Sequence, residues 1–306
     1  MAGQQPTVVG SVAHASVAGI VRFPACVMAT AGTTSTAAPA SVGRSAAGSN
    51  PMTASPVDLN GRSADARKAD GAEGIVLLHG IARRSASLGR MERAFRAEGY
   101  RTLNLDYPGR KATIQTIVEG AAPQVTAFAS GLRRLHFVTH SMGGLVARGI
   151  ITRYRPANLG RVVMLGPPNG GSEVADFLHR MRPYRLFFGP AGAQLTTHRS
   201  EDLTTLLGEV DFPLGVIAAD RSVWLIESFL ILPRPNDGRV SVARTRVTGM
   251  SDHLTLHTTH DLVILNRAAI TASIRFIRHG RFRDAPGIEE ATQTAAVAAS
   301  ASPPYL

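Results

Sequence analysis

Short, continuous apolar runs alternate with segments of helical periodicity between residues 74 and 281. The strand-sized runs are GIVLLHG (74–80), RTLNLDYPG (101–109), LHFVTH (135–140), RVVMLGPP (161–168) and LGVIAAD (214–220). Runs that are apolar throughout, without alternation, are typical of strands buried on both faces. This pattern limits the chain to an α/β fold, in which helices cover both faces of a mainly parallel sheet.

Helical periodicity fills the intervals between these runs and follows the last of them. The predicted helices are 85–100, with Gly99 as a stop signal; 113–130, where Pro123 is a potential break; 143–156, ended by Pro156; and 261–279, stopped by Gly280. In an open sheet of this kind, strand ends and helix starts gather at the carboxyl edge, where ligands bind.

Both ends of the 306-residue chain lack any such pattern. Residues 1–73 are rich in Ala, Ser, Thr and Gly, and such a segment cannot bury enough apolar area to offset its ordering entropy. We therefore expect a disordered N-terminal tail over 1–73, one folded domain over 74–281 and a flexible C-terminal tail over 282–306.

The formal net charge of +11 comes almost entirely from arginine, since Lys68 and Lys111 are the only lysines. The arginines are scattered along the sequence, so we expect a solvated basic surface and no nucleic-acid partner. A single cysteine, Cys26, excludes an internal disulfide and a cysteine-based zinc site. Because no apolar run reaches the roughly 18–20 residues of a membrane span and no signal peptide is readable, a cytoplasmic location is expected.

The segment THSMGG places Ser141 between the end of an apolar run and the start of a helix. A serine on such a tight turn needs small neighbours, which Gly143 and Gly144 provide. Thr139 stands where the G-x-S-x-G pattern has its first glycine. This segment alone leaves two roles open. Ser141 is either a nucleophile, with the N–H of Met142 facing an oxyanion, or the N-cap of an ordinary core helix.

Three further segments carry residue types that nucleophilic catalysis needs, and each has an ordinary structural interpretation as well. A His-Gly pair closes the first apolar run, either as a plain loop or to bring the N–H of Ile81 to the same oxyanion. Asp237 lies in an Asn-Asp-Gly sequence, which favours a tight reversal and by itself indicates a hairpin turn. His260 precedes the last predicted helix, and His253 and His257 compete with it as a catalytic base.

The order of these residues along the chain favours the catalytic interpretation. Ser141, Asp237 and His260 follow one another as nucleophile, acid and base, which is the order of the α/β-hydrolase arrangement. The His-Gly pair falls on a strand two before the nucleophile strand, where an oxyanion loop belongs. Together these signals predict a Ser-Asp-His triad.

From about residue 73 to residue 281 the chain resembles bacterial lipases and esterases of the α/β-hydrolase fold. The resemblance rests on IVLLHGIARRSASLGRMERAFRAEGYRTLNLDYPGR, FVTHSMGGLVAR, VVMLGPPNGGSEVAD and PNDGRVSVARTRVTGMSDHLTLHTTH. It implies a serine hydrolase that cleaves carboxylic esters through an acyl-enzyme and needs no metal or organic cofactor. The implied site residues are Ser141 as nucleophile, Asp237 as acid, His260 as base, and the backbone N–H groups of Ile81 and Met142 as oxyanion donors.

An insertion over about residues 170–210 lies where hydrolases of this fold carry a cap or lid. Phe177, Leu178, Phe187 and Phe188 are candidates for the wall of an acyl pocket, or else for plain core packing of cap helices. An amphipathic lid would favour lipid substrates and peripheral contact with lipid interfaces, whereas a fixed cap would favour small soluble esters.

Two other functions would use the same residues. An acyltransferase would pass the acyl group to an alcohol or thiol instead of water. A hydrolase-fold binding protein would do no chemistry, but such a chain would be free to lose a member of the triad, and all three are present. The expected partner is a small-molecule or lipid ester, and the sequence predicts no oligomeric state.

Overall fold

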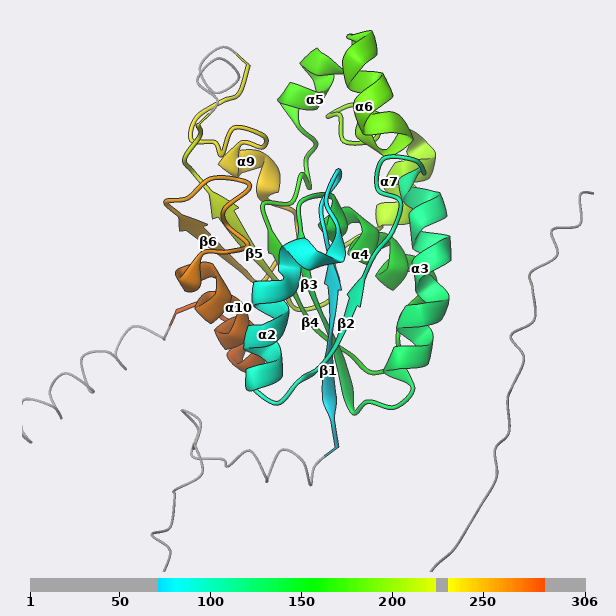
Figure 1. Cartoon of the computed structure of the whole chain (residues 1–306), viewed down its shortest axis with the longest axis vertical. Coiled ribbons are helices and arrows are strands. Elements are labelled where there is room, and N and C mark those ends of the chain that lie inside the picture. The colour runs from blue at the N-terminus through cyan, green and yellow to red at the C-terminus, as the bar shows by residue number, and fades with distance from the viewer. Residues whose placement is uncertain (1–70, 224–230, 284–306) are drawn as a thin grey trace, which may run out of the picture. The chain divides into compact units, whose positions relative to one another are not determined.

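The computed structural model describes residues 71–223 and 231–283. Within these residues, six strands form one parallel sheet in the order β2-β1-β3-β4-β5-β6 (Figure 1). The strands are β1 (Glu73–Leu78), β2 (Arg101–Leu105), β3 (Arg134–His140), β4 (Leu159–Leu165), β5 (Leu214–Ala219) and β6 (Asp252–Leu256). The α/β prediction is confirmed. The predicted tails lie outside the described residues, apart from 71–73 and 282–283.

All five predicted runs form strands. The sixth strand, β6, was not predicted from the sequence. β5 is buried at every position, which matches its unbroken apolar sequence. The sequence of β6, DHLTL, mixes polar and apolar residues, and none of its positions is fully buried. Because β6 is an edge strand, it lacks the continuous apolar signal that reveals the central strands.

Alternate residues of each strand point to opposite faces of the sheet, and each face has its own helices. Val76 and Leu78 pack with α3 (Ile114–Ala129) and α4 (Met142–Tyr154) on one face. Ile75 and Leu77 pack with α2 (Gly89–Ala97) and α10 (Arg267–His279) on the other face. A short 3-10 helix, η1 (Ser85–Leu88), precedes α2.

Two helix boundaries differ from the prediction. α3 continues through Pro123, whose side chain is exposed, so that water can satisfy the carbonyl that loses its intrahelical partner. The last helix begins at Arg267 rather than at residue 261, because the Asn266 side chain caps the first turn by accepting hydrogen bonds from Ala268 and Ala269. It ends at His279, before the predicted stop signal Gly280, which adopts a left-handed conformation.

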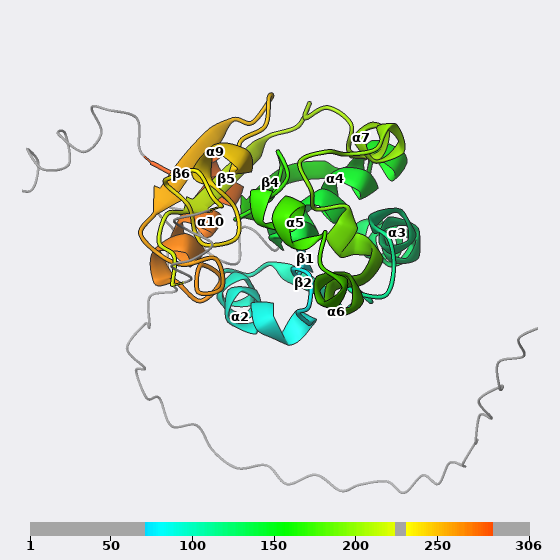
Figure 2. The ribbon, with the colours of Figure 1, turned by 90° about the horizontal axis from the view of Figure 1, so that it is seen from above.

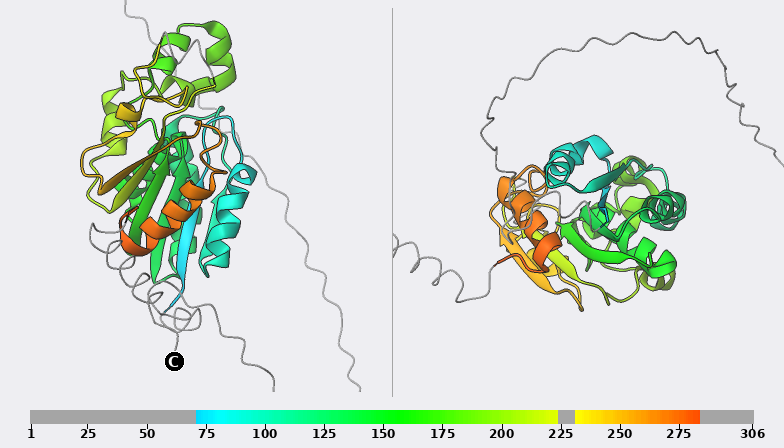
Figure 3. Two further views of the ribbon diagram at one scale, coloured as in Figure 1. Left: turned by 90° about the vertical axis from the view of Figure 1, so that its left-hand side faces the viewer. Right: turned by 90° about the horizontal axis from the view of Figure 1, so that it is seen from below.

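Three helices connect β4 to β5 in the predicted insertion: α5 (Glu173–Leu178), α6 (Arg182–Ala193) and α7 (Glu201–Leu207). Leucines of α7 join the core beside α4, while α5 and α6 lie over the carboxyl edge of the sheet (Figures 2 and 3). A one-turn helix, α9 (Val242–Thr245), lies in the connection from β5 to β6. In the described ranges, no helix has the length and apolar character needed to cross a membrane.

Candidate active site

Ser141 occupies a strained turn between β3 and α4. Its backbone has φ 53° and ψ −126°, which a residue with a side chain adopts at a cost of about 1–3 kcal/mol. Two backbone hydrogen bonds hold the turn, from the Ser141 N–H to the Leu165 carbonyl at 2.8 Å and from the Gly144 N–H to the Ser141 carbonyl at 2.9 Å. Ser141 occupies the N-cap position of α4, but its hydroxyl bonds to His260 and makes no capping hydrogen bond to the helix.

The residues that flank Ser141 are small because other backbone segments crowd them. A Cβ atom on Gly143 would lie 2.2 Å from the Leu78 carbonyl oxygen, which excludes any side chain unless the backbone moves. Upstream, Thr139 is fully buried and its hydroxyl donates to the Val163 carbonyl at 3.4 Å. This bond satisfies the hydroxyl, which explains how threonine replaces the first glycine of the common pattern.

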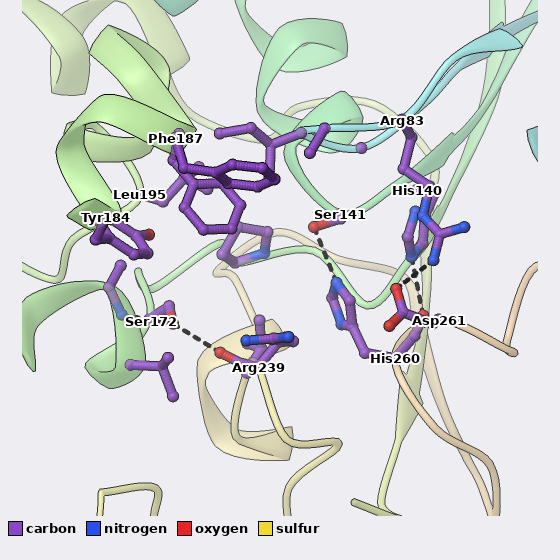
Figure 4. A pocket seen from close by; sticks show the side chains of 18 residues that line it. Arg83, His140, Ser141, Ser172, Tyr184, Phe187, Leu195, Arg239, His260 and Asp261 are labelled. Atoms are coloured by element: carbon purple, nitrogen blue, oxygen red, sulfur yellow. Dashed lines mark hydrogen bonds and ion pairs between the residues drawn. The ribbon is translucent and has the colours of Figure 1, made fainter. Parts of the chain in front are cut away.

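A hydrogen-bonded chain joins the three residues predicted as a triad. The Ser141 hydroxyl lies 3.0 Å from His260 Nε2, and His260 Nδ1 lies 2.7 Å from Asp237 Oδ2 (Figure 4 shows the first bond). All three residues are buried. The other Asp237 oxygen, Oδ1, accepts the N–H groups of Arg239 and Val240, which fixes the orientation of the carboxylate. In this arrangement the imidazole can accept the serine proton, and the carboxylate can stabilise the resulting imidazolium.

The Asn-Asp-Gly sequence forms the predicted tight reversal. Gly238 has φ 89°, and an antiparallel bridge joins Asn236 to Ser241 across the turn. This reversal is also what directs Asp237 toward His260. The hairpin and the acidic residue are therefore compatible roles of one segment.

The two competing histidines have other partners. His257 Nδ1 lies 3.0 Å from Asp220 Oδ1, and the His257 side chain is 76% exposed. His253 Nε2 lies 3.0 Å from the Thr245 hydroxyl, and burial is the main reason that the pKa of His253 falls to about 4. The structure thus brings His260, and neither competitor, to Ser141.

The loop after β1 lies beside Ser141, as an oxyanion loop requires. Ile81 lines the same cavity as Ser141, and a Cβ atom on Gly80 would lie 3.1 Å from the Ser141 Cβ. The His79 ring stacks on Tyr107 at a centroid distance of 4.0 Å, and the Tyr107 hydroxyl donates to the His79 carbonyl. Met142 is the first residue of α4, where backbone N–H groups have no intrahelical acceptor.

A cavity of about 270 Å³ opens above Ser141 and His260 (Figure 4). The cap supplies its apolar wall, formed by Val174, Ala175, Tyr184, Phe187, Phe188 and Leu195. Phe187 and Phe188 were predicted here. Phe177 and Leu178 were also predicted, but among the described residues they do not line the cavity, because α5 contributes Val174 and Ala175 of its first turn instead. The Phe177 side chain is 49% exposed.

His140, the residue before Ser141, contacts the segment that carries His260. It is buried, and its Nε2–H donates to the His260 carbonyl at 3.0 Å. Burial, together with the positive charge that His260 carries when protonated, lowers the pKa of the His140 ring to about 3. Nearby, an ion pair between Arg83 and Asp261 joins the loop after β1 to the loop of His260. These contacts link positions 120 and 178 residues apart, so local sequence patterns do not reveal them.

Comparisons with known proteins agree with this architecture. The model of the α/β-hydrolase family matches residues 75–296. The mature lipase BlEst2 of Bacillus licheniformis is similar in structure, with a TM-score of 0.54 and 17% identity over 68% of this chain and 91% of that chain. A structure from the metagenome-derived lipolytic enzymes LipS and LipT has a TM-score of 0.52 and 15% identity over 68% and 94% of the two chains. At these identities the likeness shows the fold alone. No curated protein matches the sequence.

Proposed function

We propose that this chain, which belongs to the α/β-hydrolase family, is a serine hydrolase that cleaves carboxylic esters. One observation carries the proposal: the hydrogen-bonded chain from Ser141 through His260 to Asp237, buried at the base of a cavity with an aromatic wall. A buried serine, imidazole and carboxylate in this sequence of contacts form the arrangement that activates a hydroxyl as a nucleophile.

The reaction begins when Ser141 Oγ attacks the ester carbonyl and His260 Nε2 takes the serine proton. Asp237 holds the imidazole in the tautomer that accepts at Nε2, and stabilises the imidazolium. The N–H groups of Ile81 and Met142 stabilise the oxyanion, and the N-terminus of α4 adds a favourable dipole. The tetrahedral intermediate then expels the alcohol, which takes the proton from His260. A water molecule, deprotonated by His260, attacks the acyl-enzyme in the same way and releases the acid.

The lining and the volume of the cavity support a substrate with a short or medium acyl chain. Its wall of phenylalanine, tyrosine and aliphatic side chains suits a hydrocarbon. Its volume of about 270 Å³ lies just below the roughly 300–1,000 Å³ of typical ligand pockets. The names of the similar structures, a lipase and lipolytic enzymes, are consistent with an ester substrate.

The test combines active-site labelling with turnover. A fluorophosphonate probe should label the wild-type chain, and Ser141→Ala should abolish both labelling and hydrolysis of p-nitrophenyl butyrate. Ser172→Ala is the matched control, because Ser172 lines the same cavity but donates to the Arg239 carbonyl, and this variant should still be labelled. Labelling or turnover that survives in Ser141→Ala would overturn the nucleophile assignment.

Two further outcomes would separate the other functions. A wild-type chain that neither labels nor turns over any ester would be a binding protein. Acyl transfer to an added alcohol in preference to water would identify an acyltransferase. Hydrolysis across p-nitrophenyl esters of graded length should peak at short or medium chains if the cavity sets the limit.

A further inference from the structure

Exposed apolar side chains are concentrated in one segment of the cap, residues 177–187, which we name the cap ridge. Phe177, Met181, Leu186 and Phe187 are 49%, 46%, 84% and 52% exposed. They are four of the eight large apolar side chains that are exposed in the described part of the chain, although the ridge has only eleven residues. Single exposed apolar residues are normal on a protein surface, whereas a cluster indicates an interaction site.

Positive charge accompanies this apolar surface. Arg180, Arg182 and Arg185 are exposed on the ridge, and no aspartate or glutamate occurs from residue 177 to residue 200. Within the described ranges, none of the three arginines forms an ion pair. The carboxylates of the preceding turn are engaged elsewhere, Glu173 with Arg244 and Asp176 with Thr197. The outward face of the ridge is therefore cationic as well as apolar.

The ridge is continuous with the mouth of the cavity. Phe187 lines the cavity and is also half exposed, so it belongs to both surfaces. The guanidinium of Arg110 lies 4.7 Å from the centroid of the Phe187 ring and adds a further cation at this border. Figure 3 shows the helices of the ridge beyond the carboxyl edge of the sheet.

We propose that the cap ridge docks on a lipid surface that carries anionic head groups. Exposed leucine, methionine and phenylalanine would enter the boundary between head groups and acyl chains, while the arginines would contact lipid phosphates. A nucleic acid would satisfy the arginines but leave Leu186 and Met181 in water, so a lipid surface accounts for both features. Docking would bring the cavity mouth to the surface. The proposal stands independently of the catalytic one, because it concerns binding alone.

Vesicle co-sedimentation of the full chain tests the proposal directly. We expect binding to vesicles of phosphatidylcholine with about 30% phosphatidylglycerol, weak binding to phosphatidylcholine alone, and a loss of binding as salt rises. Replacing Arg180, Arg182 and Arg185 together by glutamate should weaken binding by at least about 100-fold, because each arginine near the surface contributes roughly fivefold. Leu186→Asn should weaken it by about tenfold.

Matched controls lie on elements away from the ridge. Arg90→Glu with Arg93→Glu changes two exposed arginines at α2, and Tyr154→Asn changes an exposed apolar residue at the end of α4. Both should bind vesicles as the wild type does, and thermal unfolding should show that every variant is folded.

Equal binding to neutral and anionic vesicles, or ridge variants that bind as tightly as the controls, would overturn the proposal. So would ridge-dependent binding to polyglutamate without binding to vesicles, which would identify an acidic protein as the partner.

Discussion

His140 should make the stability of this protein depend on pH in a window that the structure defines. The ring is buried and its N–H donates to the His260 carbonyl, so the folded state holds it neutral, with a pKa of about 3. In the unfolded chain the ring takes up a proton below its ordinary pKa of 6.5. As pH falls through 6.5, the unfolded state therefore binds more protons than the folded state, and stability is lost.

The size of this loss follows from the two pKa values. At pH 4.5 the folded ring is still neutral. The loss in the free energy of unfolding is therefore determined by the two pH units between 4.5 and the ordinary pKa of 6.5. Each unit corresponds to 1.36 kcal/mol, which gives a loss of about 2.7 kcal/mol for one histidine between pH 7.5 and pH 4.5. Below the folded-state pKa of about 3 no further loss from this residue is expected.

His140→Gln isolates this contribution, because glutamine has no proton to gain and its side-chain N–H₂ group can still reach the His260 carbonyl. Urea unfolding of both chains at pH 7.5, 6.5, 5.5 and 4.5 gives the free energy of unfolding at each pH. The other buried histidines, such as His79 and His136, remain in both chains, so their effects cancel in the difference. We expect the difference in the free energy of unfolding between the wild type and His140→Gln to change by about 2.7 kcal/mol across the pH series. Parallel pH curves would refute the reasoning, because they would mean that His140 gains no proton on unfolding.

Three further outcomes are expected. His260→Ala should lower kcat by about 10⁴-fold or more, whereas His257→Ala, whose ring is 76% exposed, should change it less than about threefold; the reverse ranking would reassign the base. Gly143→Ala should destabilise the fold by about 1–3 kcal/mol in urea unfolding, because its Cβ would lie 2.2 Å from the Leu78 carbonyl; an unchanged midpoint would contradict this contact. His140→Leu should lower kcat by about 5–100-fold at constant KM, since it leaves the His260 carbonyl unpaired. His140→Gln should restore most of this loss. An equal loss of kcat in both variants would mean that His140 has a packing role only.

Burial on both faces of the sheet explains why most of the fold was predictable. A strand covered by helices on each side is buried along most of its length, so β1, β3, β4 and β5 are visible as mainly apolar runs. The edge strand β6 has no such requirement, and it was missed. The start of the last helix was also misplaced, because the decisive cap is Asn266, a residue inside a sequence that otherwise continues the helical pattern.

The candidate site was predictable to the extent that it depends on chain order. Ser141, Asp237 and His260 were chosen because their order and their elements match one arrangement, and the structure brings their side chains together. Chain order alone does not distinguish His257 from His260, and the choice of His260 rested on the resemblance to lipases and esterases. The two residues lie only three positions apart, but one ring faces Asp220 at the surface while the other faces Ser141.

Two parts of the fold build this site: the carboxyl edge of the sheet and the helices of the cap. Ser141 lies at the end of a central strand, in a turn whose neighbouring Gly143 has no room for a side chain, so its position is tightly determined. The apolar wall of the cavity comes instead from α5, α6 and the segment that follows them, where Phe187 is half exposed and Gly189 interrupts the helix with φ 60°. Side chains on such a cap can change in size without moving the hydroxyl, the imidazole or the carboxylate. The positions of the serine, histidine and aspartate therefore follow from the sheet edge, whereas the shape of the cavity depends on the cap, and sequence patterns constrain the first far more than the second.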